Sequence, residues 1–117
     1  MNSITEKFPE LIRVGHLVHI KKKVTLLNEG EVCYKVFIIE KGSVRSWFNC
    51  DGNDVTFQFF FEGDIVTSFE SMNRELPSLY NIETITESRL RIITKNELFQ
   101  FINRNVEVKK IVDDYIM

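Results

Sequence analysis

The middle of the chain alternates apolar and polar positions with a period of two, which predicts a β-strand rather than a helix. The clearest example is the segment Val55–Phe61, which reads VTFQFFF. A strand with one apolar face lies against a core. We therefore expect a core-facing row made of Val55, Phe57, Phe59 and Phe61.

Two more runs rich in β-branched and aromatic residues precede this segment, Tyr34–Glu40 and Ser43–Asn49. The turns between the runs are Lys41-Gly42 and Asp51-Gly52, in which glycine supplies the positive φ of a tight hairpin. Glycines recur at 30, 42, 52 and 63, spaced by 12, 10 and 11 residues. Such spacing is typical of an antiparallel β-roll or jelly roll. The predicted fold class is therefore mainly β, with helices at both ends.

The flanking segments complete a single domain over residues 1–117. Residues 1–15 are predicted to be helical, with Ser3 as the N-cap and Pro9 as a weak point. Residues 16–94 form the roll, with further strands at 17–20, 24–27, 65–67, 79–86 and 90–94. The irregular stretch Ser68–Ser78 either contains a short helix or is a binding loop.

Residues 95–117 are predicted to form two helices. The first begins with a capping box at Thr94–Glu97, places Leu98, Phe99 and Ile102 inward, and ends at 103–105. The second covers 106–117 and carries an apolar stripe of Val108, Ile111, Val112, Tyr115 and Ile116. A stripe of this kind either folds onto the roll or pairs with the same helix of a second copy. We favour a homodimer interface at these residues.

Composition narrows the class further. The chain is 44% apolar with ten phenylalanines, which indicates a packed core. The longest apolar run, Val36–Ile39, is far short of the roughly 20 residues of a membrane helix. Glu6 and Pro9 stand where a signal peptide is apolar, so we expect a cytoplasmic protein with no membrane partner. The net charge of −2 gives no indication of nucleic-acid binding by this segment itself.

Metal and redox chemistry are not indicated. Cys33 and Cys50 lack CxxC spacing and are expected to be ordinary reduced thiols. His16 and His19 are the only histidines and would point to opposite faces of a strand. We expect no metal site, no cofactor and no catalytic residues. The basic triplet 21–23 is either a patch that binds an anionic partner or, as we favour, a group of solvated charges that protects an exposed strand edge from aggregation.

Five motifs stand in a recognisable order over residues 20–117. They are FIIEKGSVRSWF at 37–48, DGND at 51–54, FFFEGDIV at 59–66, FESM at 69–72 and IETITESRLRIITKNEL at 82–98. In this order and spacing the chain resembles the cyclic-nucleotide-binding-like sensor domain of Crp/Fnr-type transcription regulators, and FESM followed by Pro77-Ser78 resembles the Bacteroidetes branch. The resemblance implies a dimer that controls a winged helix-turn-helix domain. We expect that DNA-binding domain to be absent from this chain.

The departures from the family pattern concern the ligand. In relatives that bind cyclic AMP, a Gly-Glu pair holds the ribose and an Arg-Ser/Thr-Ala segment pairs with the phosphate. Aligned from Gly63-Asp64, this chain has Thr67-Ser68 and Pro77-Ser78-Leu79 at those places. Losing the arginine removes charge-assisted hydrogen bonds, so we do not expect cyclic AMP to bind. The loop could supply substitutes if it is offset, and its pocket candidates are Ser68, Phe69, Glu70, Ser71, Arg74, Pro77 and Ser78, with Glu75 beside them.

Arg45 and Trp47 complete the candidate pocket, because the fold that the resemblance implies places their strand and the loop from Ser68 to Leu79 around one pocket. Alternation puts both side chains on the same face of that strand. Such a pair could bind an anionic or planar ligand. It could equally be an arginine lying on an exposed ring, which we favour. The predicted function is an effector-sensing and dimerisation domain with an unknown small-molecule effector. The alternatives are a stand-alone protein-interaction or small-anion-binding module and a metal-dependent cupin enzyme. The absence of any histidine after His19 argues against the cupin.

Overall fold

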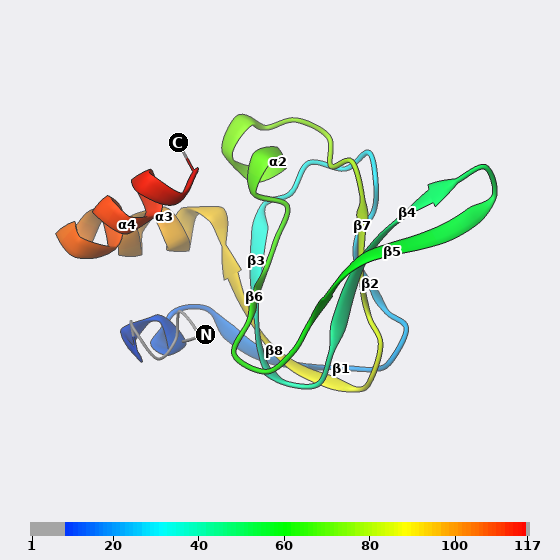
Figure 1. The fold of residues 1–117 in the computed structure, drawn as a ribbon. Coiled ribbons are helices and arrows are strands. Elements are labelled where there is room, and N and C mark those ends of the chain that lie inside the picture. Colours follow the sequence, from blue (N-terminus) through cyan, green and yellow to red (C-terminus); the bar gives the residue numbers. More distant parts are fainter. Residues whose placement is uncertain (1–8, 117) are drawn as a thin grey trace.

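The computed structural model describes residues 9–116, except the side chains of residues 111, 112 and 114–116. Eight strands form two four-stranded antiparallel sheets that face each other (Figure 1). In chain order the elements are η1 (Pro9–Arg13), β1 (His16–Ile20), β2 (Thr25–Leu27), β3 (Lys35–Lys41), β4 (Val44–Cys50), β5 (Asn53–Phe60), β6 (Ile65–Val66), α2 (Phe69–Arg74), β7 (Asn81–Thr84), β8 (Ser88–Thr94), α3 (Lys95–Arg104) and α4 (Val106–Ile116).

The order of the strands confirms the predicted β-roll. One sheet has the order β1-β8-β3-β6 and the other β2-β7-β4-β5. Consecutive strands β3 and β4 therefore belong to different sheets, and the chain crosses between them at Gly42. This glycine has φ +108°, and a Cβ atom here would lie 2.2 Å from Ser88 Oγ. The predicted turn glycine is thus required both by its backbone conformation and by this close approach.

The core is built around β3, where Val36, Phe37, Ile38 and Ile39 are all buried. Four buried residues in a row mean that both faces of the strand are covered. Figure 1 shows β4 and β7 on one side of β3, and α3, α4 and η1 on the other. The helices contribute Leu11, Phe101 and Ile102 to the same apolar cluster. None of the helices in the described part of the chain is long and apolar enough to span a membrane.

The prediction that β5 faces the core is wrong. Val55, Phe57, Phe59 and Phe61 are 36%, 48%, 55% and 58% exposed, whereas Phe60 packs against the core. A β-bulge explains the error. Ser46 of β4 pairs with Gln58 and the next residue, Trp47, pairs with Thr56, so Phe57 is an extra residue. An extra residue reverses the alternation of side chains, and a period-two pattern that crosses it cannot lie on one face.

Both ends of the roll follow the predictions with changes in detail. The described part of the N-terminal segment is a 3-10 helix over Pro9–Arg13, and residues 1–8, including Ser3, lie outside the described range. The stretch Ser68–Ser78 contains the short helix α2, one of the two forms foreseen.

Cys33 and Cys50 are both free thiols, the first buried and the second exposed.

The capping box is confirmed. Glu97 N donates to Thr94 Oγ1 over 3.2 Å, and Thr94 N donates to Glu97 Oε1 over 3.0 Å. These bonds to Thr94 hold the pKa of Glu97 below its ordinary value. Helix α3 turns Phe101 and Ile102 inward, but Phe99 is 38% exposed, so its predicted inward position is wrong. The ring of Phe99 instead lies 5.5 Å from the ammonium group of Lys95.

Helix α4 forms over nearly the predicted range, and its first stripe residue is docked. Val108 is 6% exposed and belongs to the core cluster of its own chain. This side chain is therefore covered without a second copy. The side chains of Ile111, Val112, Tyr115 and Ile116 lie outside the described residues, so the dimer interface stays a prediction for them.

Two substitutions test whether β5 is exposed, because truncating a buried side chain lowers the free energy of unfolding more than truncating an exposed one. Leu90→Ala removes a fully buried side chain and is expected to lower the free energy of unfolding by about 2–5 kcal/mol. Phe57→Ala removes a half-exposed ring with two aromatic neighbours, whose pairs are each worth about 0.5–1.5 kcal/mol. Urea denaturation of the two variants checks this. A larger loss for Phe57→Ala than for Leu90→Ala would show that the ring is buried after all.

Candidate functional site

Two motif positions meet inside the roll: Ser68, where the family pattern has a glutamate, and Ser78, which keeps the serine of the family's Arg-Ser-Ala segment. Ser68 follows β6, and Ser78 precedes β7, on either side of α2. Both side chains are buried, and Ser78 Oγ lies 3.3 Å from Ser68 Oγ. Ser78 Oγ also lies 2.8 Å from the carbonyl oxygen of Tyr80, to which it donates. The structure thus brings these two candidates together, ten residues apart in sequence.

The backbone around Ser78 is fixed by the turn that follows β2. Ser78 N donates to Glu31 O over 2.8 Å, and Gly30 N donates to Ser78 O over 2.8 Å. The neighbouring residue Pro77 forms an isolated β-bridge with Val32. Pro77 itself is exposed. The site is therefore held by main-chain bonds from a segment almost 50 residues earlier.

An aromatic group lies beside the two serines. The ring of Phe57 is 5.0 Å from that of Tyr80, nearly edge-on, and 5.9 Å from that of Phe48. The hydroxyl of Tyr80 donates to the carbonyl oxygen of Thr67 over 3.3 Å. Phe48 of β4, Phe57 of β5 and Tyr80, which precedes β7, therefore form one aromatic group. Tyr80 connects this group to Ser78, whose hydroxyl donates to its carbonyl oxygen.

The other loop candidates do not point toward the two serines. Arg74 is exposed and pairs with Glu70, one turn earlier in α2, at 3.4 Å. Glu75 has a left-handed backbone conformation and pairs with Lys95 at 3.3 Å. The charged residues of α2 are therefore engaged on its outer side.

Two candidates of the FESM motif differ in burial. Ser71 is buried, where its hydroxyl donates to the carbonyl oxygen of Leu76 and accepts from Cys33 N over 2.9 Å. Those bonds occupy the Ser71 hydroxyl in holding the loop. Phe69 is 37% exposed at the start of α2.

Arg45 and Trp47 lie on the opposite, outer face of their sheet. Their neighbours on β4, Val44 and Ser46, are buried inside the roll, so alternation turns Arg45 and Trp47 outward. The structure therefore does not bring this pair together with Ser68 and Ser78. The guanidinium carbon of Arg45 lies 4.9 Å from the centre of the Trp47 ring, as one of the two foreseen arrangements requires.

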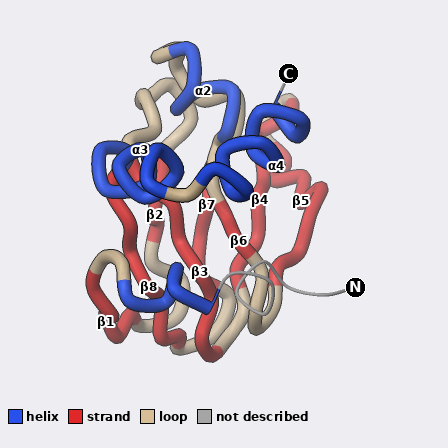
Figure 2. Tube along the Cα trace, turned by 90° about the vertical axis from the view of Figure 1, so that its left-hand side faces the viewer, coloured by secondary structure: helices blue, strands red, loops and turns tan. Residues whose placement is uncertain are grey.

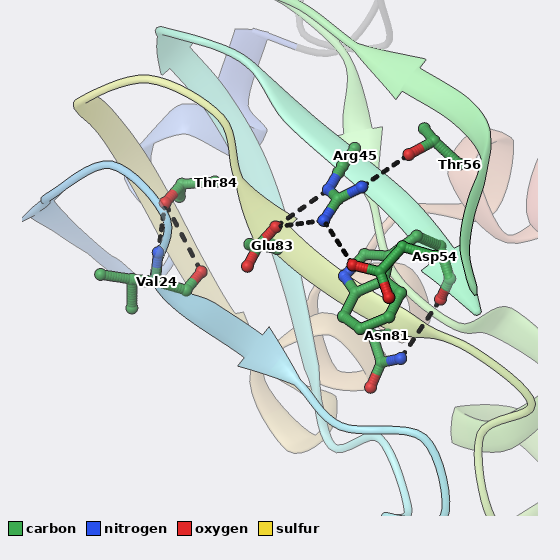
Figure 3. A network of polar contacts seen from close by, with 8 residues as sticks. Val24, Arg45, Asp54, Thr56, Asn81, Glu83 and Thr84 are labelled. Atoms are coloured by element: carbon green, nitrogen blue, oxygen red, sulfur yellow. Dashed lines mark hydrogen bonds and ion pairs between the residues drawn. The ribbon is translucent and has the colours of Figure 1, made fainter. Parts of the chain in front are cut away.

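The guanidinium of Arg45 is bonded on all sides, as Figure 3 shows. Its Nε and Nη2 lie 2.9 and 2.8 Å from Glu83 Oε1, and Nη1 donates to Thr56 Oγ1 over 2.7 Å. Asp54 lies 3.9 Å away. Arg45 thereby links three adjacent strands, β5, β4 and β7. Trp47 Nε1 is buried without a hydrogen-bond partner among the described residues.

A shallow hollow of about 460 Å³ lies next to this network. It is lined by Lys23, Arg45, Thr56, Phe59, Glu83, Thr84 and Ile85. Lys23 belongs to the basic triplet, which is an exposed turn between β1 and β2. Thr84 fixes that turn, since its Oγ1 accepts from Val24 N over 2.9 Å (Figure 3). The same hydroxyl donates to Lys21 O over 2.7 Å. In the described part of the chain, no cluster of histidine, cysteine and acidic residues could hold a metal ion.

Sequence reasoning missed the residues that complete both groups. Glu83 stands directly opposite Arg45 in the β4–β7 register, a pairing that only the register reveals. Tyr80 and Phe48 were also missed. The alternation Ser78-Leu79-Tyr80 carried no usable signal, because an apolar residue between two polar ones is expected to turn inward, whereas Leu79 is 78% exposed.

Comparisons with known proteins agree with this geometry. A family model described as the cyclic nucleotide-binding domain matches residues 17–105. A search of curated protein sequences finds no match.

Solved structures share the fold. The catabolite activator protein of Thermus thermophilus superimposes with a TM-score of 0.81 at 12% identity, over 95% of this chain and 52% of that protein. The sensor domain of the transcriptional regulator DNR from Pseudomonas aeruginosa has a TM-score of 0.78 at 13% identity, over 92% of this chain and 72% of that chain. The EAL enzyme Bd1971, in a half-site-occupied form, has a TM-score of 0.75 at 20% identity, over 88% of this chain and 93% of that chain.

The family match covers most of the chain, including both sheets from β1 onward, the Ser68–Ser78 loop and α3. The solved structures add that this fold occurs in the sensor domains of Crp/Fnr-type regulators. The chain belongs to the cyclic nucleotide-binding domain family.

Proposed function

We propose that this chain is the sensing and dimerisation part of a Crp/Fnr-type transcription regulator whose ligand loop does not take cyclic AMP. The observation that carries the proposal is the pair of buried hydroxyls, Ser68 and Ser78, where the family pattern has a glutamate and an arginine-serine segment. The likeness to the DNR sensor domain and to a catabolite activator protein supports the regulatory role. The chain spans about half the length of that catabolite activator protein, so control of DNA binding is part of the proposal.

The missing arginine is expected to lower the affinity for a cyclic phosphate strongly. Each hydrogen bond to a charged group is worth about 1.5–3 kcal/mol. An arginine that holds a phosphate with two such bonds contributes about 3–6 kcal/mol, which is a factor of about 100 to 10,000 in the dissociation constant. Two serine hydroxyls offer neutral hydrogen bonds only, and the exposed Pro77 has no side-chain donor at all.

The nearby charged side chains do not provide a substitute in this conformation. Arg74 is 65% exposed and faces Glu70, and Lys95 faces Glu75. Arg45 lies on the outer face, where Glu83 and Thr56 already bind its guanidinium group. We infer that Arg45 and Trp47 brace the sheet and do not bind the effector.

The site also lacks the requirements of covalent catalysis. An activated serine needs a histidine or another base within hydrogen-bond reach. The partners of Ser68 and Ser78 in the described chain are each other, Tyr80 and main-chain groups of β2–β3 and α2. We therefore assign the chain a binding role and no enzymatic one, in the cytoplasm, where a DNA regulator acts.

The output of the domain is assigned to α4. Val108 docks this helix on the core, so a second copy would meet only the residues of the stripe beyond it. The interface we propose consists of Ile111, Val112, Tyr115 and Ile116, meeting along a two-fold axis. A shift along that seam would reorient an attached DNA-binding domain.

One observation favours a second candidate function. Phe57 and Phe59 of β5 and Phe61, which follows the strand, are all about half exposed. Large aromatic side chains exposed to solvent often mark a protein interface. The chain could therefore act as a stand-alone protein-interaction module without DNA-binding output.

Titration calorimetry with cyclic AMP and cyclic GMP tests the ligand proposal. We expect no binding heat up to about 1 mM ligand, because the phosphate has no cationic partner. The control is Arg74→Ala, which should change nothing. The double variant Ser68→Glu with Pro77→Arg should raise the affinity for cyclic AMP. A low-micromolar dissociation constant that disappears in Arg74→Ala would overturn the proposal.

A double-mutant cycle tests the role given to Arg45. Arg45→Ala and Glu83→Ala should show a coupling energy of about 1–2 kcal/mol in urea denaturation, because both side chains are only about one-fifth exposed. The matched control is the exposed pair Arg74 and Glu70, for which we expect about 0–0.5 kcal/mol. Equal coupling in the two pairs would argue against a bracing role.

Sedimentation velocity tests the interface on α4. A version of the chain extended beyond Met117 should dimerise at tens of micromolar, and Ile111→Asp should abolish this by placing a charge in an apolar seam. The control is Lys110→Asp, next to it on an exposed position. A monomeric extended chain, or an unchanged dimer in Ile111→Asp, contradicts the proposal.

A further inference from the structure

The two sheets end in four edge strands, and one of them differs from the others. The edges are β1 and β6 in one sheet and β2 and β5 in the other. An unpaired edge is a template for another strand, and proteins usually protect it by shortening it or by adding charge or proline. β6 and β2 follow this rule with two and three residues, and β1 has five. β5 has eight.

The composition of β5 gives its edge little protection. Its sequence, NDVTFQFF, contains no lysine, arginine or proline and a single charge, Asp54. That carboxylate lies 3.9 Å from Arg45 on the neighbouring strand, which offsets its charge. The one protective feature is the bulge at Phe57. Between the bulge and the hairpin turn, the four residues from Asn53 to Thr56 still pair regularly with β4.

The free side of β5 is also accessible. Figure 1 shows the β4–β5 hairpin projecting beyond the roll, and Figure 2 shows β5 at the margin of the sheets. Within the described chain, the backbone of Asn53–Phe60 is hydrogen-bonded only to β4. About half of its backbone N–H and C=O groups therefore point to solvent, beside exposed Val55 and Phe57.

We propose that the edge of β5 is an interaction surface that pairs antiparallel with β5 of a second copy of this chain. A nearly neutral, apolar edge suits a partner of the same kind, and a second copy supplies one without opposing runs of like charge. Antiparallel pairing about a two-fold axis uses both edges at once, so the assembly closes at two copies. The two four-stranded sheets that contain β5 then join into one continuous sheet.

This surface is separate from the one proposed on α4, so the test starts from the Ile111→Asp chain. Sedimentation from about 10 µM to about 500 µM should show self-association of that chain, as mass action requires. Val55→Lys, which adds charge to the edge, should weaken the association at least about tenfold. Gln58→Lys adds the same charge without removing an apolar group, and it should also weaken the association. The matched control, Val106→Lys, changes an 84% exposed valine away from β5 and should leave it unchanged.

Hydrogen exchange provides a readout specific to backbone pairing. The alternate amides of Asn53–Phe60 that face away from β4 should exchange more slowly as concentration rises, and Val55→Lys should remove that dependence. A chain that stays monomeric over the whole range overturns the proposal. So does association in which these amides exchange at one rate at every concentration, since another surface then makes the contact.

Discussion

The double-sided burial of β3 is the constraint on which the rest of the fold depends. Its four consecutive apolar residues require cover on both faces. The second sheet supplies one cover and the helices η1, α3 and α4 supply the other. Each such side chain contributes about 1.5–3 kcal/mol when it leaves water. The chain must therefore cross between sheets at Gly42 and later return as α3, and both features follow from this one strand.

The parts of the fold that local chemistry determines could be predicted from the sequence. The eight strands, the glycine turn at 42 and the capping box at Thr94 each depend on a few adjacent residues. The face of β5 could not be predicted, because the bulge at Phe57 is set by pairing with β4. The exposure of Phe99 was missed for a different reason, because its ring lies near the ammonium group of Lys95, one turn earlier in the same helix.

The candidate site shows a similar division. Ser68 and Ser78 were identified from motif positions, and the fold places their hydroxyls together. Arg45 and Trp47 were grouped with them because the resemblance implied one pocket between their strand and the loop, and alternation put the pair on one face. Which face that is depends on the burial of Val44 and Ser46, and the partner Glu83 depends on register. The outcome is a buried neutral site and a separate charged network, with a sheet between them.

The capping box at Thr94 has a mechanical consequence. Thr94 is at once the last residue of β8 and the N-cap of α3, so strand and helix are joined without a loop. The two reciprocal hydrogen bonds fix the angle of this joint. Helix α3 is ten residues long, or about 15 Å, so a tilt of about 5° at β8 moves its far end by about 1 Å. A rotation of β8 inside the roll would therefore be carried through α3 and displace α4.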